Sequence, residues 1–216
     1  MFKLFEFILH IDKYLQAIVS QYSTLTYGLL FLIILTETGI VIMPFLPGDS
    51  LLFAAGALAA TGSFQIYTLF TVIFIAAVIG DTLNYHIGKF IGPKIFTKES
   101  SLFYHKEHMA RAQHFYEKHG RKTIILARFI PIIRTFAPFV AGIGTMPYGV
   151  FLAYNVIGGA LWSALFIFGG FFFGNIPIVQ ENFGMVIIAI ILISLIPLIK
   201  EVVFHFLLNK KISIKK

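Results

Sequence analysis

The sequence predicts an all-α integral membrane protein, in which transmembrane helices accompany two opposed re-entrant helical hairpins arranged as an inverted repeat. The first observation is composition: of 216 residues, 58% are hydrophobic and 12% are charged, about half the charged fraction of a typical soluble domain. The second is a set of charge-free stretches near or above the roughly 20 residues that a membrane helix needs. The third is a pair of apolar stretches that proline and glycine interrupt.

Five segments follow one another along the chain. The N-terminal residues place apolar side chains at helical spacing with polar ones between them, which favours an amphipathic helix at the outer membrane surface. Simple spans are predicted at Phe64–Ile87, Tyr148–Gly174 and Gly184–Leu208. The segments are the N-terminal amphipathic helix (1–26), the first hairpin with its span (27–88), a basic loop with an amphipathic helix (89–121), the second hairpin with its span (122–174) and a C-terminal span (184–208).

The two hairpins are predicted where the apolar stretches are interrupted. In the first, Pro44, Pro47 and Gly48 end one helix ahead of a piece too short to cross a bilayer. In the second, Pro131 and Pro138 are predicted to break the helix. Broken backbone at membrane depth is tolerated only inside protein or beside a wet cavity, so we expect both stretches to enter and leave on the same side.

The two interrupted stretches resemble each other. Residues 45–47 (FLP) match residues 129–131 (FIP). Residues 55–57 (AGA) match residues 141–143 (AGI), with two extra residues between the motifs. Paired interrupted segments in corresponding halves indicate an inverted-repeat transporter with its site near the bilayer midplane.

Positive charge sets the predicted orientation. The loop from Lys89 to Lys122 carries eight Lys or Arg residues against three acids, and the C-terminus adds four lysines. The positive-inside rule places both on the cytoplasmic side. The overall charge of +7 is then explained by contact with anionic lipid, and no nucleic-acid partner is expected.

Four charges lie in the interrupted stretches, where a charge costs about 2.5–3.5 kcal/mol at the centre of a membrane helix. Glu37 and Asp49 lie in the first stretch, and Arg128 and Arg134 in the second. Arginine presents a planar fork of donors that suits phosphate, whereas a carboxylate in a low dielectric can carry a proton near neutral pH. We therefore predict that the arginines bind a phosphate and that the acids act as proton-coupled gates. Structural ion pairs that pin the hairpins together are the alternative.

A fifth charge, Asp81, lies toward the end of the first span. It either joins the proton path or forms a local cap or a pair with Lys89, because charges near the membrane interface are less costly.

The sequence contains no cysteine, which excludes disulfides and thiolate metal sites. The histidines between His105 and His119 lack the spacing of a two-histidine zinc helix, so a solvated amphipathic helix is expected there. No set of acid, base and nucleophile can be assembled. We expect no enzyme activity, no cofactor and no metal, and we expect Trp162 to face lipid or fill the core.

At its charged motifs the sequence resembles the DedA family, whose shared region is also called the VTT or SNARE-associated domain. The matching motifs are Glu37 with Gly39, PFLPGDSLLFAAGALA (44–59), GDTLNYHIGKFIG (80–92) and RFIPIIRTFAPFVAGIGTM (128–146). The resemblance implies a multi-pass protein of the bacterial inner membrane with proton-motive-force-linked transport. For some members it implies flipping of undecaprenyl phosphate. It also implies that the two acids and two arginines of the interrupted stretches are the functional set.

The predicted function is a proton-linked flippase of an anionic lipid carrier, most simply undecaprenyl (polyprenyl) phosphate, with membrane lipid and protons as partners. Two alternatives stay open: a proton-coupled antiporter of small cations or solutes, and a non-transporting membrane scaffold. The small-xxx-small spacings at Gly88–Gly92 and Gly170–Gly174 favour close packing within the fold, with a homo-oligomer as the alternative.

Overall fold

The computed structural model describes residues 23–40, 48–95, 106–144 and 146–182, together with positions 185, 186 and 189. Four predicted features lie wholly or almost wholly outside these residues: the N-terminal helix at 1–26, the span at 184–208, Pro44 and Pro47. All regular structure in the described ranges is helical. The elements are α3 (Ser23–Gly39), α4 (Gly48–Ala60), α5 (Ile66–Ile95), α6 (Lys106–His119), the 3-10 turn η1 (Gly120–Lys122), α7 (Thr123–Ala127), α8 (Pro131–Ile143), α9 (Tyr148–Gly174) and α10 (Pro177–Glu181).

Two of these helices are long and apolar enough to cross a membrane. They are Ile66–Phe90 within α5, with 25 residues, and Tyr148–Gly174, with 27. At 1.5 Å per residue each is longer than the roughly 30 Å of a hydrocarbon core. The prediction of an all-helical protein with long apolar helices is confirmed in this part of the chain.

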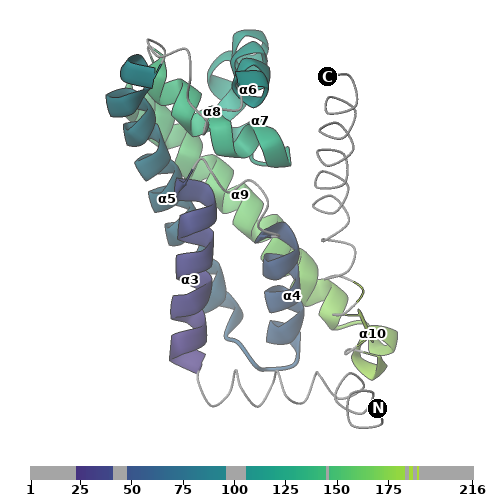
Figure 1. Ribbon diagram of the computed structural model, residues 1–216. Coiled ribbons are helices and arrows are strands. Elements are labelled where there is room, and N and C mark those ends of the chain that lie inside the picture. The colour runs from purple at the N-terminus through teal and green to yellow at the C-terminus, as the bar shows by residue number, and fades with distance from the viewer. Residues whose placement is uncertain are drawn as a thin grey trace, which may run out of the picture.

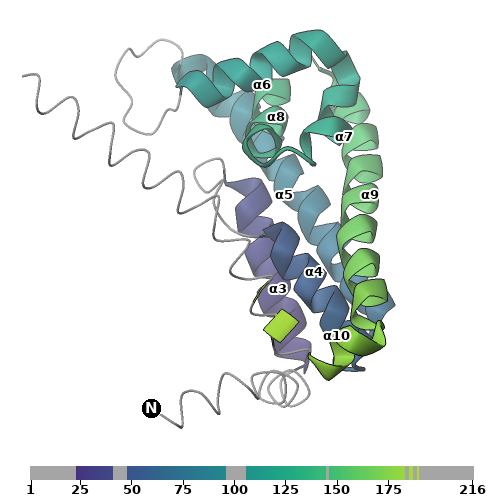
Figure 2. The ribbon, with the colours of Figure 1, turned by 90° about the vertical axis from the view of Figure 1, so that its right-hand side faces the viewer.

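The shorter helices flank these two in a regular way. Figure 1 shows α3 beside α5 and α4 beside α9, and both neighbouring pairs are in contact. Figure 2 shows α6 lying across one end of the molecule, transverse to the long helices. The amphipathic helix predicted at 105–119 is therefore present as α6, and its Tyr116 packs against a buried cluster that includes Tyr85 and Phe151.

Both interrupted stretches contain a helical break. The first stretch is divided into α3, which ends at Gly39, and α4, which begins at Gly48. In the second, α7 ends at Ala127 and Pro131 is the first residue of α8. Proline suits this position because its fixed φ matches the helix and the N–H that it lacks would have no helical acceptor.

The predicted break at Pro138 is wrong, because α8 continues through Pro138 to Ile143. A proline inside a helix removes the donor for the carbonyl four residues earlier, here that of Arg134. Neighbouring helices re-satisfy such freed backbone groups in membrane proteins. At this point Asn84 of α5 donates its Nδ2 to the adjacent carbonyl, that of Thr135, at 2.8 Å.

Glycine sets the distance between α4 and α9. A Cβ added to Gly56 of α4 would lie 2.2 Å from the carbonyl oxygen of Ile167 on α9. In the opposite direction, a Cβ on Gly170 of α9 would lie 2.0 Å from the carbonyl oxygen of Phe53 on α4. The two backbones therefore touch, and the spacing predicted at Gly170–Gly174 serves packing within the fold.

The same reciprocal contact joins α8 and α5. A Cβ on Gly142 of α8 would lie 2.0 Å from the carbonyl oxygen of Tyr85, and one on Gly88 of α5 would lie 2.2 Å from that of Phe139. Each short helix that follows a break therefore packs closely, through glycines, on the long helix from the other half of the chain: α4 packs on α9, and α8 packs on α5.

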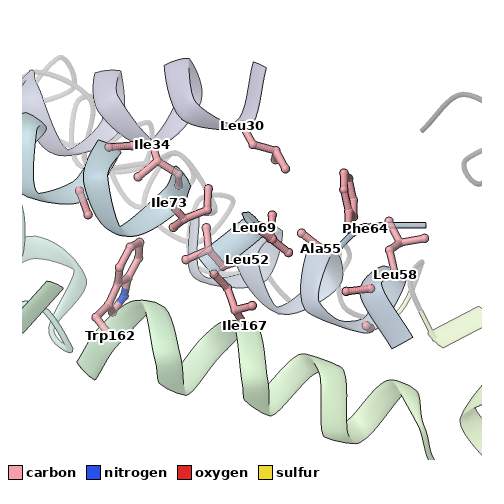
Figure 3. Close-up of a cluster of buried hydrophobic side chains, with 14 of the residues drawn as sticks. Leu30, Ile34, Leu52, Ala55, Leu58, Phe64, Leu69, Ile73, Trp162 and Ile167 are labelled. Atoms are coloured by element: carbon pink, nitrogen blue, oxygen red, sulfur yellow. The ribbon is translucent and has the colours of Figure 1, made fainter. Parts of the chain in front are cut away.

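An apolar core fills the space between α3, α4, α5 and α9. Figure 3 shows Leu52 and Ile167 facing each other between α4 and α9, with Ile73 and Trp162 nearby. Many large apolar side chains instead point outward, for example Leu29 at 58% and Leu165 at 58% exposure. An apolar core inside an apolar exterior is the pattern expected of helices in contact with lipid.

Candidate functional site

The first cluster of charges forms around Arg134, in the first turn and a half of α8. Its Nη2 donates to Oε1 of Glu37 near the end of α3, and its Nη1 donates to Oδ1 of Asp49 in the first turn of α4. The guanidinium therefore holds carboxylates from both sides of the break between α3 and α4. The side chains of Glu37 and Arg134 are 1% and 9% exposed, whereas that of Asp49 is 31% exposed.

Trp162 of α9 completes this first cluster. Its indole Nε1 donates to Oδ1 of Asp49 at 3.0 Å, and the guanidinium of Arg134 lies 5.4 Å from the centre of its ring. A cation over an indole face is attracted by the ring quadrupole. Trp162 lies in the core, as one of the two predicted alternatives has it, and it also contacts two charged groups, which was not predicted from the sequence.

The second cluster forms around Arg128, directly after α7. Its Nη2 donates both to Oδ2 of Asp81 on α5 and to Oδ1 of Asn155 on α9. The amide nitrogen of Asn155 in turn donates to the carbonyl of Val78 at 3.0 Å. Asp81 therefore pairs across the fold, whereas Lys89, the predicted local partner, is exposed on the same helix.

Glycines on α9 make room for the buried Arg128 side chain. A Cβ on Gly158 would lie 3.1 Å from Cδ of Arg128, and one on Gly159 would lie 3.6 Å from its Nη2. Arg128 is 4% exposed as a whole residue. Its guanidinium is thus enclosed by two helices, whereas the side chain of Asp49 beside Arg134 is 31% exposed.

A small cavity lies between the two clusters and is lined by residues of both. It has a volume of about 10 Å³, which is about the space needed for one water molecule. It is lined by Thr38, Asp81, Arg128, Arg134, Thr135 and Trp162. This space is too small for a phosphate group.

The two clusters together hold three carboxylates and two guanidinium groups. When all five groups are ionised, the described site carries one excess negative charge. Uncompensated charge is costly in a low-dielectric environment. Oε2 of Glu37 is buried and lies against Gly48 at the start of α4.

Sequence reasoning found the charged members of the site and missed its neutral ones. The structure brings Glu37, Asp49 and Arg134 together, and Arg128 with Asp81 beside them. Asn155 and Trp162 were not selected. They share one inward face of α9 with Gly158 and Gly159, at spacings of three and four residues. The alignment of an amide, two glycines and an indole on one helix face is the sequence pattern that could have identified Asn155 and Trp162 as site residues.

The fold and site define a helical membrane protein with two adjoining arginine–carboxylate clusters. Residues 46–172 match the family model of the VTT domain. Over 204 residues the chain is 50% identical to protein DedA of Escherichia coli (strain K12), covering 94% of this chain and 93% of that protein. The chain belongs to the DedA family of membrane proteins, so the resemblance seen in its motifs is confirmed.

Further relatives support the same conclusion. An uncharacterized membrane protein of Mycobacterium leprae is 44% identical over 165 residues, which cover 76% of this chain and 74% of the relative. The inner membrane protein YqjA of Escherichia coli (strain K12) is 32% identical over 153 residues, or 70% of this chain and 69% of that protein. None of these three names states an enzymatic activity. No solved structure matches the chain.

Proposed function

We propose that this protein is a proton-linked flippase of an anionic lipid carrier, most simply undecaprenyl or another polyprenyl phosphate. The observation that carries the proposal is the arrangement at Arg134, where two carboxylates occupy both edges of one guanidinium. Carboxylate and phosphate oxygens use the same bidentate geometry toward arginine. Glu37 and Asp49 therefore occupy the positions that phosphate oxygens would take.

The proposed topology places the broken helices as opposed re-entrant hairpins of an inverted repeat. The reciprocal glycine contacts support it, because α4 packs on α9 in the same way as α8 packs on α5. In this proposal the basic loop 89–122 and the C-terminus are cytoplasmic, and α6 lies along the inner membrane surface. The site is then reached from the bilayer, and the polyprenyl tail stays in lipid while the headgroup enters.

The order of exchange follows from exposure. Asp49 has the most exposed side chain of the charged cluster, so the headgroup first replaces Asp49 on Arg134. Glu37 is buried and leaves Arg134 only when it takes up a proton and loses its charge. Arg128, across the cavity, supplies a second positive charge near the bound anion and keeps Asp81 as its partner. Protonation and headgroup binding thereby become linked.

The experiment that tests this proposal is flux of labelled undecaprenyl phosphate in proteoliposomes with an imposed pH gradient. The expected result is flux that requires the wild-type protein, responds to the gradient and falls in an Arg134→Lys variant. Lysine keeps the positive charge but lacks the planar set of N–H donors that binds two oxygens at once. Flux in Arg134→Lys equal to that of wild type would remove Arg134 from headgroup binding.

A second candidate, a proton-coupled antiporter of small cations or solutes, is favoured by the excess negative charge of the site. Three carboxylates around two guanidinium groups leave one negative charge, which a bound cation would neutralise. Cation flux in the same proteoliposomes without lipid flux would select this candidate. If neither lipid flux nor cation flux is observed, and an Arg134→Lys variant complements a deletion strain, the membrane scaffold is selected.

A further inference from the structure

Asn84 of α5 is a fully buried amide with an unusual pair of acceptors. Its Nδ2 donates to the carbonyl of Thr38 on α3 at 3.1 Å and to the carbonyl of Thr135 on α8 at 2.8 Å. The acceptors lie 46 and 51 residues away from Asn84 in sequence. One side chain therefore binds the backbone of both broken segments.

Both acceptors directly follow a charged residue of the site. Thr38 follows Glu37, and Thr135 follows Arg134. Each carbonyl also lies where the helix is weakened. Thr38 is in the last turn of α3, whose carbonyls have no partner within the helix. Thr135 follows the residue whose helical donor is removed by proline.

The face of α5 around Asn84 is built for this double contact. Gly80 and Gly88 lie four residues before and after Asn84, so all three share one face of the helix. A Cβ on Gly80 would lie 3.1 Å from the backbone nitrogen of Gly39 on α3 and still closer to Thr38. At Gly88 the neighbour is α8, with the carbonyl oxygen of Phe139 2.2 Å from an added Cβ. The glycines thus let both backbones approach, and the amide between them binds one carbonyl from each.

We infer that Asn84 is a positioning residue of the anion site, which sets the distance between Glu37 and Arg134 by binding the backbone next to each. The inference rests on the proposed function, since it assigns Asn84 a role in headgroup binding. Asn84 acts through Thr38 and Thr135 and does not contact the headgroup. By contrast, Asp49 lies on α4, which packs on α9, and its carboxylate is held by Trp162 and Arg134.

The chain supplies its own reporter for this inference, because it contains one tryptophan. Trp162 donates to Asp49 and stacks on Arg134, so its emission responds when an anion displaces Asp49. The experiment is a titration of the full-length protein, in micelles of a neutral maltoside detergent, with dodecyl phosphate. Wild type is expected to give a saturable change in emission, and an uncharged alkyl alcohol of the same length is expected to give none.

Two variants remove, in different ways, the two hydrogen bonds that Asn84 donates. Asn84→Asp keeps the shape and loses the amide donor, and Asn84→Ser is too short to reach both carbonyls. The half-saturating concentration of dodecyl phosphate is expected to rise about tenfold in each, the effect of one lost buried hydrogen bond. The emission maximum of the ligand-free variants is expected to shift as well. Asn175→Asp is the matched control, because Asn175 is exposed and donates only to the carbonyl of Phe171 in its own helix.

Thermal unfolding of each variant separates positioning from general stability. A purely structural role lowers the unfolding temperature and leaves the half-saturating concentration unchanged. If one variant fails to fold, the other still decides the outcome. A half-saturating concentration within twofold of wild type in a folded Asn84 variant overturns the inference. A wild-type protein that gives no response to dodecyl phosphate instead contradicts the proposed function, so the two failures are distinguishable.

Discussion

The two arginines of the second interrupted stretch lie six residues apart in sequence and occupy very different surroundings. Arg134 is held by two carboxylates from separate helices, one of them 31% exposed, and it stacks on an indole. Arg128 is enclosed by α5 and α9 and bound to Asp81 and Asn155. The comparison shows that residues of the same type, predicted from sequence to share one role, differ in how readily their partners can be exchanged.

This difference divides the proposed roles. Arg134 exchanges partners, because Asp49 can move toward solvent and leave one edge of the guanidinium open. Arg128 keeps its partners, because two helices enclose it and no comparable exit exists for Asp81. Four substitutions test this division, in order of expected effect.

The largest effect is expected from Arg128→Ala. Removing one partner of a buried ion pair leaves the other charge uncompensated and costs about 3–5 kcal/mol. The variant should therefore accumulate poorly and unfold at a markedly lower temperature, which size-exclusion and thermal-unfolding measurements in detergent would show. An Arg128→Ala protein as stable as wild type would contradict the assignment of a fixed role to Arg128.

Arg134→Lys should affect binding more than folding. Lysine keeps the charge near Glu37 but cannot serve two oxygens on separate edges, and a lost charge-assisted hydrogen bond costs about 1.5–3 kcal/mol. Half-saturation by dodecyl phosphate is therefore expected to rise about 10- to 100-fold, with an unfolding temperature close to that of wild type. The division of roles between the two arginines is contradicted if Arg134→Lys is less stable than Arg128→Ala.

Gly48→Ala tests the Glu37 contact without changing any charge. An added Cβ would lie 1.9 Å from Oε2 of Glu37, so the carboxylate must move. This displacement weakens the Glu37–Arg134 pair, which positions the guanidinium, so we expect the half-saturating concentration of dodecyl phosphate to rise about tenfold, the effect of one lost hydrogen bond. Gly28→Ala is the matched control, because nothing lies within 4 Å of its added Cβ. Equal behaviour of the two variants would contradict the steric argument.

Asp49→Asn should have the smallest effect, and in the opposite direction. The amide oxygen still accepts from Trp162 and Arg134, but it no longer competes as an anion. Binding of dodecyl phosphate is expected to tighten about two- to fivefold, because the competitor bound by a charge-assisted hydrogen bond becomes neutral. Fluorescence titrations measure this effect, and weaker binding in Asp49→Asn would argue against competition.

Much of this architecture could be predicted from local sequence. The long apolar helix at Tyr148–Gly174 coincides with the prediction, because a charge-free stretch leaves few alternatives. The break before Pro131 follows from proline chemistry. Pro138 was misread because a membrane helix tolerates an internal proline when neighbouring helices surround it, and local rules do not see that packing.

The site shows the same division between local and long-range information. Charges inside apolar stretches are conspicuous, so the acids and arginines could be selected from sequence. Which acid pairs with which arginine depends on how α3, α4, α5 and α8 pack, and no local pattern encodes it. The polar contacts of Trp162 were missed for a related reason: an indole in an apolar helix resembles any other large apolar residue until a carboxylate is placed beside its N–H.

In the proposed function, Glu37 and Asp49 occupy, on Arg134, the place of a lipid phosphate. The decisive measurement is an experimental structure of the protein with undecaprenyl phosphate bound. We expect phosphate oxygens within hydrogen-bond distance of the Arg134 guanidinium, with the Asp49 carboxylate displaced from Nη1. A bound phosphate remote from Arg134, with both carboxylates still held by the guanidinium, would contradict it.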